Sequence, residues 1–105
     1  MHQSNRASIM NNTKWDELRL GMYDLGEFTP MWRTCDTETG YICEWDKEWF
    51  YHFNVGGYET IEWVELKIES ELQEQAILEF LQAKNIPVKA SEFGYKIYGY
   101  FSDTK

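Results

Sequence analysis

Acidic and aromatic side chains crowd one short stretch of this sequence, residues 34–53. It contains in close succession Glu44, Trp45, Asp46, Glu48 and Trp49. Carboxylates form strong charge-assisted hydrogen bonds with Lys and Arg, and Trp and Tyr are frequent anchors of protein–protein interfaces. The composition of this stretch therefore favours recognition of a basic protein partner.

His52 follows in the same stretch, and Glu44, Glu48 and Glu59 are near it in the chain. A histidine beside a carboxylate can perform general acid–base catalysis, but no nucleophile motif, oxyanion-hole pattern or metal-ligand set accompanies this one. We therefore expect a surface or structural histidine and no catalytic residue. The alternative is a small-ligand binder or minor enzyme with an aromatic pocket lined by Tyr51, His52 and Glu62.

Cys35 and Cys43 are too few for a zinc site of the usual kind. The whole chain has two Cys and two His, whereas a structural zinc ion takes four such ligands. We expect two free thiols, no metal and no cofactor. A cross-strand disulfide is the alternative, and it requires that the two residues lie directly opposite each other.

Charge is distributed unevenly over the 105 residues. The net charge is −8, and residues 36–79 contain 12 acidic and two basic side chains. Such a field repels nucleic acid and anionic membranes and attracts a cationic protein. The sequence has no apolar run long enough to span a bilayer and no signal peptide, so we expect a cytoplasmic protein.

Local patterns predict two helices. Residues 1–11 are polar and are expected to form a disordered leader, and residues 102–105 a frayed tail, around one domain of residues 12–101. Apolar residues at helical spacing predict a helix over residues 14–25 with Thr13 as its N-cap, and Gly21 within it indicates a close contact with the sheet. Ser70 should cap a second helix over residues 71–84.

Strand patterns fill most of the remaining chain. They predict strands at residues 31–35 and 58–68, with one residue of lost alternation near Trp63 that indicates a β-bulge or a strand buried on both faces. Residues 41–45 and 48–53 should form a tight hairpin around Asp46 and Lys47. A second hairpin follows Pro87.

Together these elements predict an α+β fold. It is an antiparallel β-meander of about four strands plus a C-terminal hairpin, with two helices packed on one face and the other face open. Acidic and aromatic side chains on that open face would bind the partner. The predicted partner-binding residues are Glu44, Trp45, Asp46, Glu48, Trp49, Glu59, Glu62, Trp63 and Glu65. A homodimer formed through the same face is a further possibility.

Several segments resemble a family of small bacterial proteins catalogued only as a domain of unknown function. They are T-K-W-D-E-L-R-L at residues 13–20, M-W-R-T at 31–34, G-Y-I-C-E-W-D-K-E-W-F-Y-H-F at 40–53, I-E-W-V-E at 61–65 and Y-G-Y at 98–100. The resemblance covers about residues 13–100 and implies no activity. In size, acidity and aromatic content the chain is also similar to immunity proteins that neutralise bacterial toxins. We therefore expect a non-enzymatic, acidic protein-binding module, such as an immunity protein or antitoxin that blocks a basic toxin.

Overall fold

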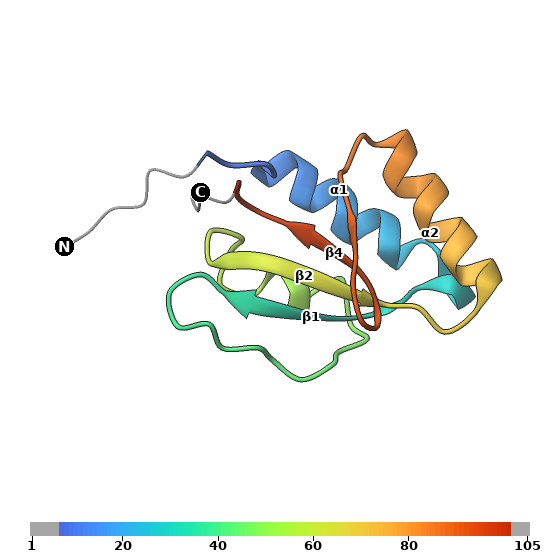
Figure 1. Ribbon diagram of the computed structural model, residues 1–105, viewed down its shortest axis with the longest axis horizontal. Coiled ribbons are helices and arrows are strands. Elements are labelled where there is room, and N and C mark those ends of the chain that lie inside the picture. The colour runs from blue at the N-terminus through green and yellow to red at the C-terminus, as the bar shows by residue number, and fades with distance from the viewer. Residues whose placement is uncertain (1–6, 102–105) are drawn as a thin grey trace.

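The computed structural model describes residues 7–101, which form one antiparallel sheet with two helices against it (Figure 1). In chain order the elements are α1 (Asn12–Tyr23), the 3-10 helix η1 (Gly26–Phe28), β1 (Met31–Asp36), the 3-10 helix η2 (His52–Asn54), β2 (Ile61–Lys67), α2 (Glu71–Ala83), β3 (Lys89–Ala90) and β4 (Gly94–Tyr98). The strand order is β1-β2-β4-β3, and all neighbours are antiparallel. The predicted α+β class and C-terminal hairpin are confirmed.

Side-chain caps fix the starts of both helices. Ser70 accepts a hydrogen bond from the backbone N–H of Gln73, as predicted for α2. The cap of α1 is Asn11, whose side chain accepts from the N–H of Lys14 at 2.8 Å, so the helix begins two residues earlier than the Thr13 cap implied. Neither helix in the part of the chain described is long and apolar enough to cross a bilayer.

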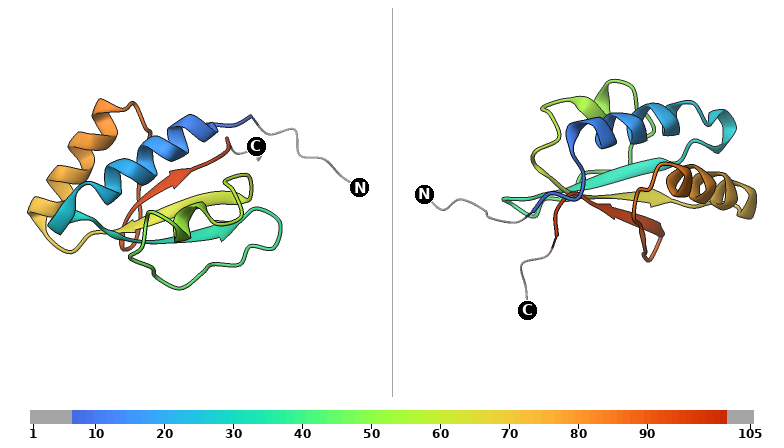
Figure 2. Two further views of the ribbon diagram at one scale, coloured as in Figure 1. Left: turned by 180° about the vertical axis from the view of Figure 1, so that it is seen from behind. Right: turned by 90° about the horizontal axis from the view of Figure 1, so that it is seen from above.

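The core lies between the helices and one face of the sheet. Its buried side chains include Trp15, Leu18 and Met22 of α1, Ile77 and Leu81 of α2, and Val64, Leu66 and Ile97 of the sheet. Figure 2 shows both helices on the same side, as predicted. We call the opposite side of the sheet the outer face.

The predicted contact of Gly21 with the sheet is wrong. A Cβ atom at Gly21 would lie 2.0 Å from Cζ of Phe80 in α2. The missing side chain therefore lets the Phe80 ring lie against the backbone of α1, and the contact joins the two helices.

The predicted hairpin of residues 41–53 does not form. Ile42 and Asp46 make isolated bridges to Cys35 and Trp32 of β1, and the chain then enters a turn and η2. The cause is local, because the carboxylates of Asp46 and Glu48 accept hydrogen bonds from the following backbone N–H groups. Side chains that bind nearby backbone in this way compete with strand pairing.

A one-residue irregularity in β2 accounts for its change of alternation. Cys35 pairs with Trp63, but Asp36 pairs with Ile61, so Glu62 is an extra residue. Across this bulge Ile61 and Val64 both face the core. The predicted bulge is confirmed, and the middle of the strand is also buried on both faces.

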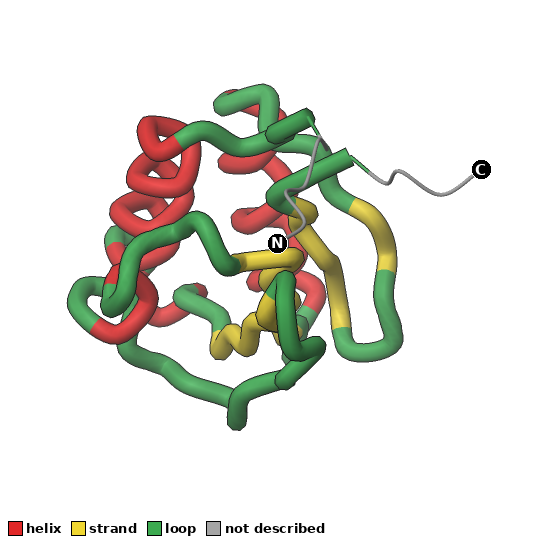
Figure 3. The backbone as a smooth tube through the Cα atoms, turned by 90° about the vertical axis from the view of Figure 1, so that its left-hand side faces the viewer, coloured by secondary structure: helices red, strands yellow, loops and turns green. Residues whose placement is uncertain are grey.

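The predicted disordered leader is wrong for residues 7–11. Ser8 bridges Tyr100, and the N–H of Ile9 donates to the carbonyl of Gly99 at 2.8 Å. The N–H of Phe101 donates to Ala7 at 2.9 Å, so the two ends of the described chain lie together (Figure 3). Met10 is buried. The rest of the predicted leader, 1–6, and the predicted tail, 102–105, lie outside the described residues.

Candidate partner-binding surface

Residues 46–54, here called the aromatic turn, are held to the body of the protein by two buried rings. Trp49 is 1% exposed, and its Nε1–H donates to the carbonyl of Pro30 at 2.8 Å. Phe53 packs with its ring centroid 4.7 Å from that of Trp49 and 5.0 Å from that of Trp32. Large buried rings contribute strongly to core stability, so both ends of the turn are fixed.

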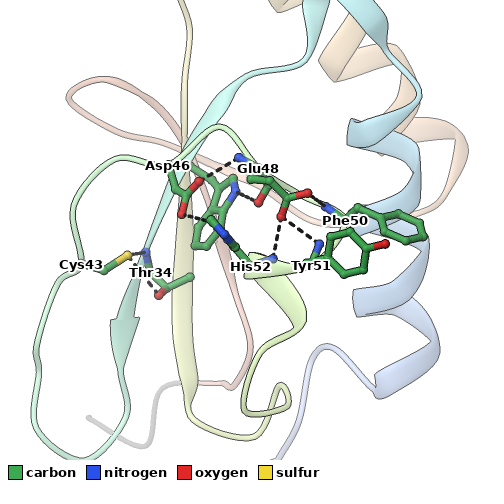
Figure 4. Close-up of polar contacts among 8 residues, drawn as sticks. Thr34, Cys43, Asp46, Glu48, Phe50, Tyr51 and His52 are labelled. Carbon is green, nitrogen blue, oxygen red and sulfur yellow. Dashed lines mark hydrogen bonds and ion pairs between the residues drawn. The ribbon is translucent and has the colours of Figure 1, made fainter.

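Glu48 organises the backbone between these two anchors. Its carboxylate accepts hydrogen bonds from the N–H groups of Phe50, Tyr51 and His52 at 3.2, 2.9 and 2.7 Å (Figure 4). Asp46 in turn accepts from the N–H of Glu48 at 2.8 Å. These bonds satisfy backbone donors that no strand partner reaches.

The same hydrogen bonds keep both carboxylates charged. The hydrogen bonds from the N–H groups of His52, Tyr51 and Phe50 lower the pKa of Glu48. Desolvation would raise this pKa, but its effect is smaller. Burial alone would raise the pKa of Asp46, but its bonds from Glu48 and His52 outweigh burial and lower it. The turn therefore carries two negative charges well below neutral pH.

The middle of the aromatic turn projects its rings outward. Tyr51 is 69% exposed and Phe50 37% exposed. The Phe50 ring lies edge-on to Tyr51 at 4.9 Å and 5.2 Å from the ring of Tyr23 in α1. Arg19 donates to the carbonyl of Phe50 at 2.6 Å. The result is an exposed aromatic cluster on an ordered backbone.

His52 lies at the surface of the turn beside Asp46. Its Nδ1 is 2.9 Å from Oδ2 of Asp46, and its backbone N–H binds Glu48. The expected ring neighbours Glu44 and Glu59 make no hydrogen bond to it within residues 7–101. Two cavities of about 540 and 440 Å³ in the described chain include none of Tyr51, His52 and Glu62 in their linings, so the pocket expected from those residues is not found at either.

The outer face differs from the predicted acidic surface. Glu65 is 1% exposed, and its carboxylate accepts from Arg33 at 2.9 and 3.0 Å and from the Ser91 hydroxyl at 2.6 Å. Burial alone would raise the pKa of Glu65, but the bonds from Ser91 and Arg33 and the Arg33 charge outweigh it and lower the pKa. Glu65 is an internal counter-ion and is inaccessible to a partner.

Cations lie over the aromatic rings of the outer face. The ammonium of Lys96 is 4.0 Å from the ring centroid of Trp63, and the guanidinium of Arg33 is 4.5 Å from that of Trp45. Cations are attracted to ring faces at such distances. Trp63 is 9% exposed beneath this cover, so the outer face presents positive charge where carboxylates were expected.

The nine predicted residues therefore separate into several places. Asp46 and Glu48 meet in the aromatic turn, and Glu44 is exposed just before it. The other six are Trp49 in the core, Trp45, Trp63 and Glu65 on the outer face, Glu62 at the bulge of β2, and Glu59, exposed beside the 440 Å³ cavity. The prediction of Trp49, Trp63 and Glu65 as exposed contacts is wrong.

Sequence reasoning missed Phe50 and Tyr23 as surface rings. Trp49 and Phe53 are four residues apart, which is the spacing of one helical face, whereas strand alternation groups Trp49 with Tyr51 and Phe53. The carboxylates at positions 46 and 48 were a second signal, since short acidic side chains commonly bind the backbone of turns. Those two signals together would have indicated a capped turn.

The cysteines are free and half-buried. Cys35 pairs with Ile42, and Cys43 instead lies against Thr34, whose N–H approaches its Sγ at 3.3 Å. Burial, followed by the nearby Glu62 charge, raises the pKa of Cys35, which keeps its thiol protonated. Within residues 7–101 no three His, Cys, Asp or Glu side chains are grouped as metal ligands.

Comparison with known proteins identifies the family of this chain. No curated protein matches it. No solved structure matches it either. The model of a family of unknown function, DUF6678, matches residues 1–104. Since the match covers almost the whole sequence, the chain belongs to the DUF6678 family of unknown function.

Proposed function

We propose that this protein is a non-enzymatic binding module that uses the aromatic turn and Tyr23 to bind a basic protein. The observation that carries the proposal is the exposure of Phe50 and Tyr51 between two buried anchors. Exposed aromatic rings are the usual hot spots of interfaces. The Phe50 ring lies beside both Tyr51 and the exposed ring of Tyr23, so the three rings form one exposed aromatic group.

Preorganisation supports the proposal. Three backbone bonds to Glu48 hold the turn, and Arg19 binds its carbonyl at Phe50. A surface that is ordered before binding loses less conformational entropy on association. The backbone that carries Phe50 and Tyr51 is thus ordered before binding, which favours a specific partner.

Charge supports a basic partner. Asp46 and Glu48 stay ionised through their depressed pKa values. Glu44 is exposed just before the turn, Asp24 is exposed directly after Tyr23, and the whole protein carries −8. Opposite charge accelerates association and selects among partners. An immunity protein or antitoxin that covers the basic site of a bacterial toxin is the form of this function that we propose.

Affinity capture from the source cell tests the proposal with tagged wild type and a Phe50→Ser/Tyr51→Ser variant. We expect the wild type to retain a basic protein that the variant loses, because the anchoring rings are gone. A Leu72→Ser variant is the matched control, since Leu72 is an exposed apolar residue on α2. It should retain the partner.

Two results would contradict the proposal. One is capture of the same proteins by the wild type and the double variant, both shown to be folded by circular dichroism. The other is no captured protein at low salt. If a partner is captured, expressing it alone and with the wild type tests immunity directly, because co-expression should restore growth only if the partner is a toxin that the turn blocks.

A further inference from the structure

Strand pairing gathers three cations into one row of the outer face. Arg33 of β1 pairs with Glu65 of β2, Glu65 pairs with Lys96 of β4, and Lys96 pairs with Lys89 of β3. Arg33 is neutralised by Glu65 at 2.9 Å. The two lysines come next in the row.

Lys89 and Lys96 are a like-charged pair directly opposite each other. Within residues 7–101 neither forms an ion pair with a carboxylate, and the contacts of their ammonium groups are with rings, Tyr98 at 5.5 Å and Trp63 at 4.0 Å. Like charges directly opposite on antiparallel strands destabilise a sheet. The protein as a whole carries −8, so this pair is a local concentration of positive charge on an acidic protein.

A cavity of about 540 Å³ opens beside these lysines. Its lining includes Lys89, Lys96, Val88, Tyr98, Tyr100 and Phe101. Ligand sites typically measure about 300–1,000 Å³ and combine an apolar lining with a few polar groups. Apolar and aromatic walls suit a flat apolar body, and the two ammonium groups suit a negatively charged head.

We infer that this cavity, here called the lysine pocket, binds an aryl anion, meaning a carboxylate or phosphate attached to a flat apolar ring system. The anion relieves the repulsion between Lys89 and Lys96, and the ring system contacts the tyrosines and Phe101. The lysine pocket is formed by other residues than the aromatic turn, so binding here is separate from the proposed protein contact.

Titration calorimetry of the full chain tests the inference with three probes of similar shape. They are naphthalene-2-carboxylate, 2-naphthyl phosphate and the neutral naphthalene-2-carboxamide. We expect at least one anion to bind tenfold or more tightly than the amide, because a charge-assisted hydrogen bond contributes about a tenfold factor or more. The comparison of the two anions identifies which head group the lysines prefer. Amide chemical shifts of Val88, Lys89 and Tyr98 should change on binding.

Lys96→Met is the main variant, because it removes the charge and keeps an aliphatic chain over Trp63. It should weaken binding of the preferred anion about tenfold, and Lys89→Met provides a second variant at the more exposed lysine. Lys84→Met is the matched control, since Lys84 is an exposed lysine outside the cavity lining and outside the aromatic turn, and it should leave affinity unchanged. The inference is overturned if neither anion binds at millimolar concentration, if the amide binds equally well, or if Lys84→Met weakens binding as much as the pocket variants do.

Discussion

The aromatic turn and the outer face are both built from aromatic rings and charged groups, yet they use them in opposite ways. In the turn, the Glu48 carboxylate binds the backbone and the rings of Phe50 and Tyr51 face solvent. On the outer face, the Glu65 carboxylate is buried and cations cover the rings of Trp45 and Trp63. Composition therefore predicts which residue types a region contains, whereas hydrogen-bonding partners decide whether its carboxylates, its rings or its cations are exposed.

The largest expected effect separates the anchor of the aromatic turn from its exposed ring. Trp49→Ala should lower the free energy of unfolding by about 3–5 kcal/mol, because it empties a ring-sized volume in the core. Tyr51→Ala should change it by less than about 0.5 kcal/mol, as is usual for exposed positions. Urea unfolding of both variants measures the difference. Equal losses of stability in the two variants would contradict the assignment of Trp49 as a buried anchor and Tyr51 as an exposed ring that does not stabilise the fold.

The next largest effect concerns the buried carboxylate of the outer face. Glu65→Ala should lower the free energy of unfolding by about 3 kcal/mol, because it leaves Arg33 without its counter-ion. Replacing both partners, as in Arg33→Met/Glu65→Leu, should recover much of that loss, since no unpaired charge remains. Glu44→Ala is the control and should change stability little. A Glu65 variant as stable as the Glu44 variant would refute the assignment of Glu65 as an internal counter-ion.

A smaller effect should appear in the dependence of stability on pH. Folding lowers the pKa of Glu65 from its ordinary value of 4.5, so its contribution is complete above that pH and is lost as the pH falls through the lowered value. The difference in urea midpoint between wild type and Glu65→Gln should therefore shrink from pH 7 to pH 3. Asp46 and Glu48 have lowered pKa values too, but the wild type and Glu65→Gln both retain them, so their effects cancel in the difference. A difference in urea midpoint that stays constant from pH 7 to pH 3 would contradict the lowered pKa of Glu65.

The smallest effect is confined to the backbone of the aromatic turn. Glu48→Ala removes the acceptor for three N–H groups, so the amides of Phe50, Tyr51 and His52 should exchange hydrogen faster. The amide of Ile97 in β4 should exchange at its wild-type rate, because its strand is distant from the change. Glu44→Ala is the control for loss of charge alone. Unchanged exchange at Tyr51 would show that Trp49 and Phe53 suffice to order the turn.

Local signals in the sequence predicted the elements that depend on neighbouring residues. Ser70 and the apolar spacing after it located α2 within one residue of its end, and the lost alternation near Trp63 located the bulge. The turn at residues 46–54 was missed because side chains bind its backbone, which alternation does not encode. An aromatic run is compatible with a strand or a turn, and here the hydrogen bonds from the backbone to the Glu48 carboxylate favour the turn.

The arrangement of charges on the outer face could not be predicted from the sequence for a different reason. Arg33, Glu65, Lys96 and Lys89 are far apart in the chain, and only the strand order β1-β2-β4-β3 places them in one row. The count of acidic residues between 36 and 79 indicated an acidic surface, but it did not reveal that Glu65 is buried and paired with Arg33. Charge in sequence and charge at the surface therefore diverge most where sheet register pairs distant residues.

The bond between Ala7 and Phe101 also has a topological consequence. It brings the two ends of the described chain together, and proteins whose ends meet commonly tolerate circular permutation. A short linker between residues 7 and 101 would close the backbone into a ring, which could be reopened at the exposed glycines Gly56 and Gly57. New ends there would move fusion partners away from the lysine pocket and would leave the aromatic turn continuous in the chain.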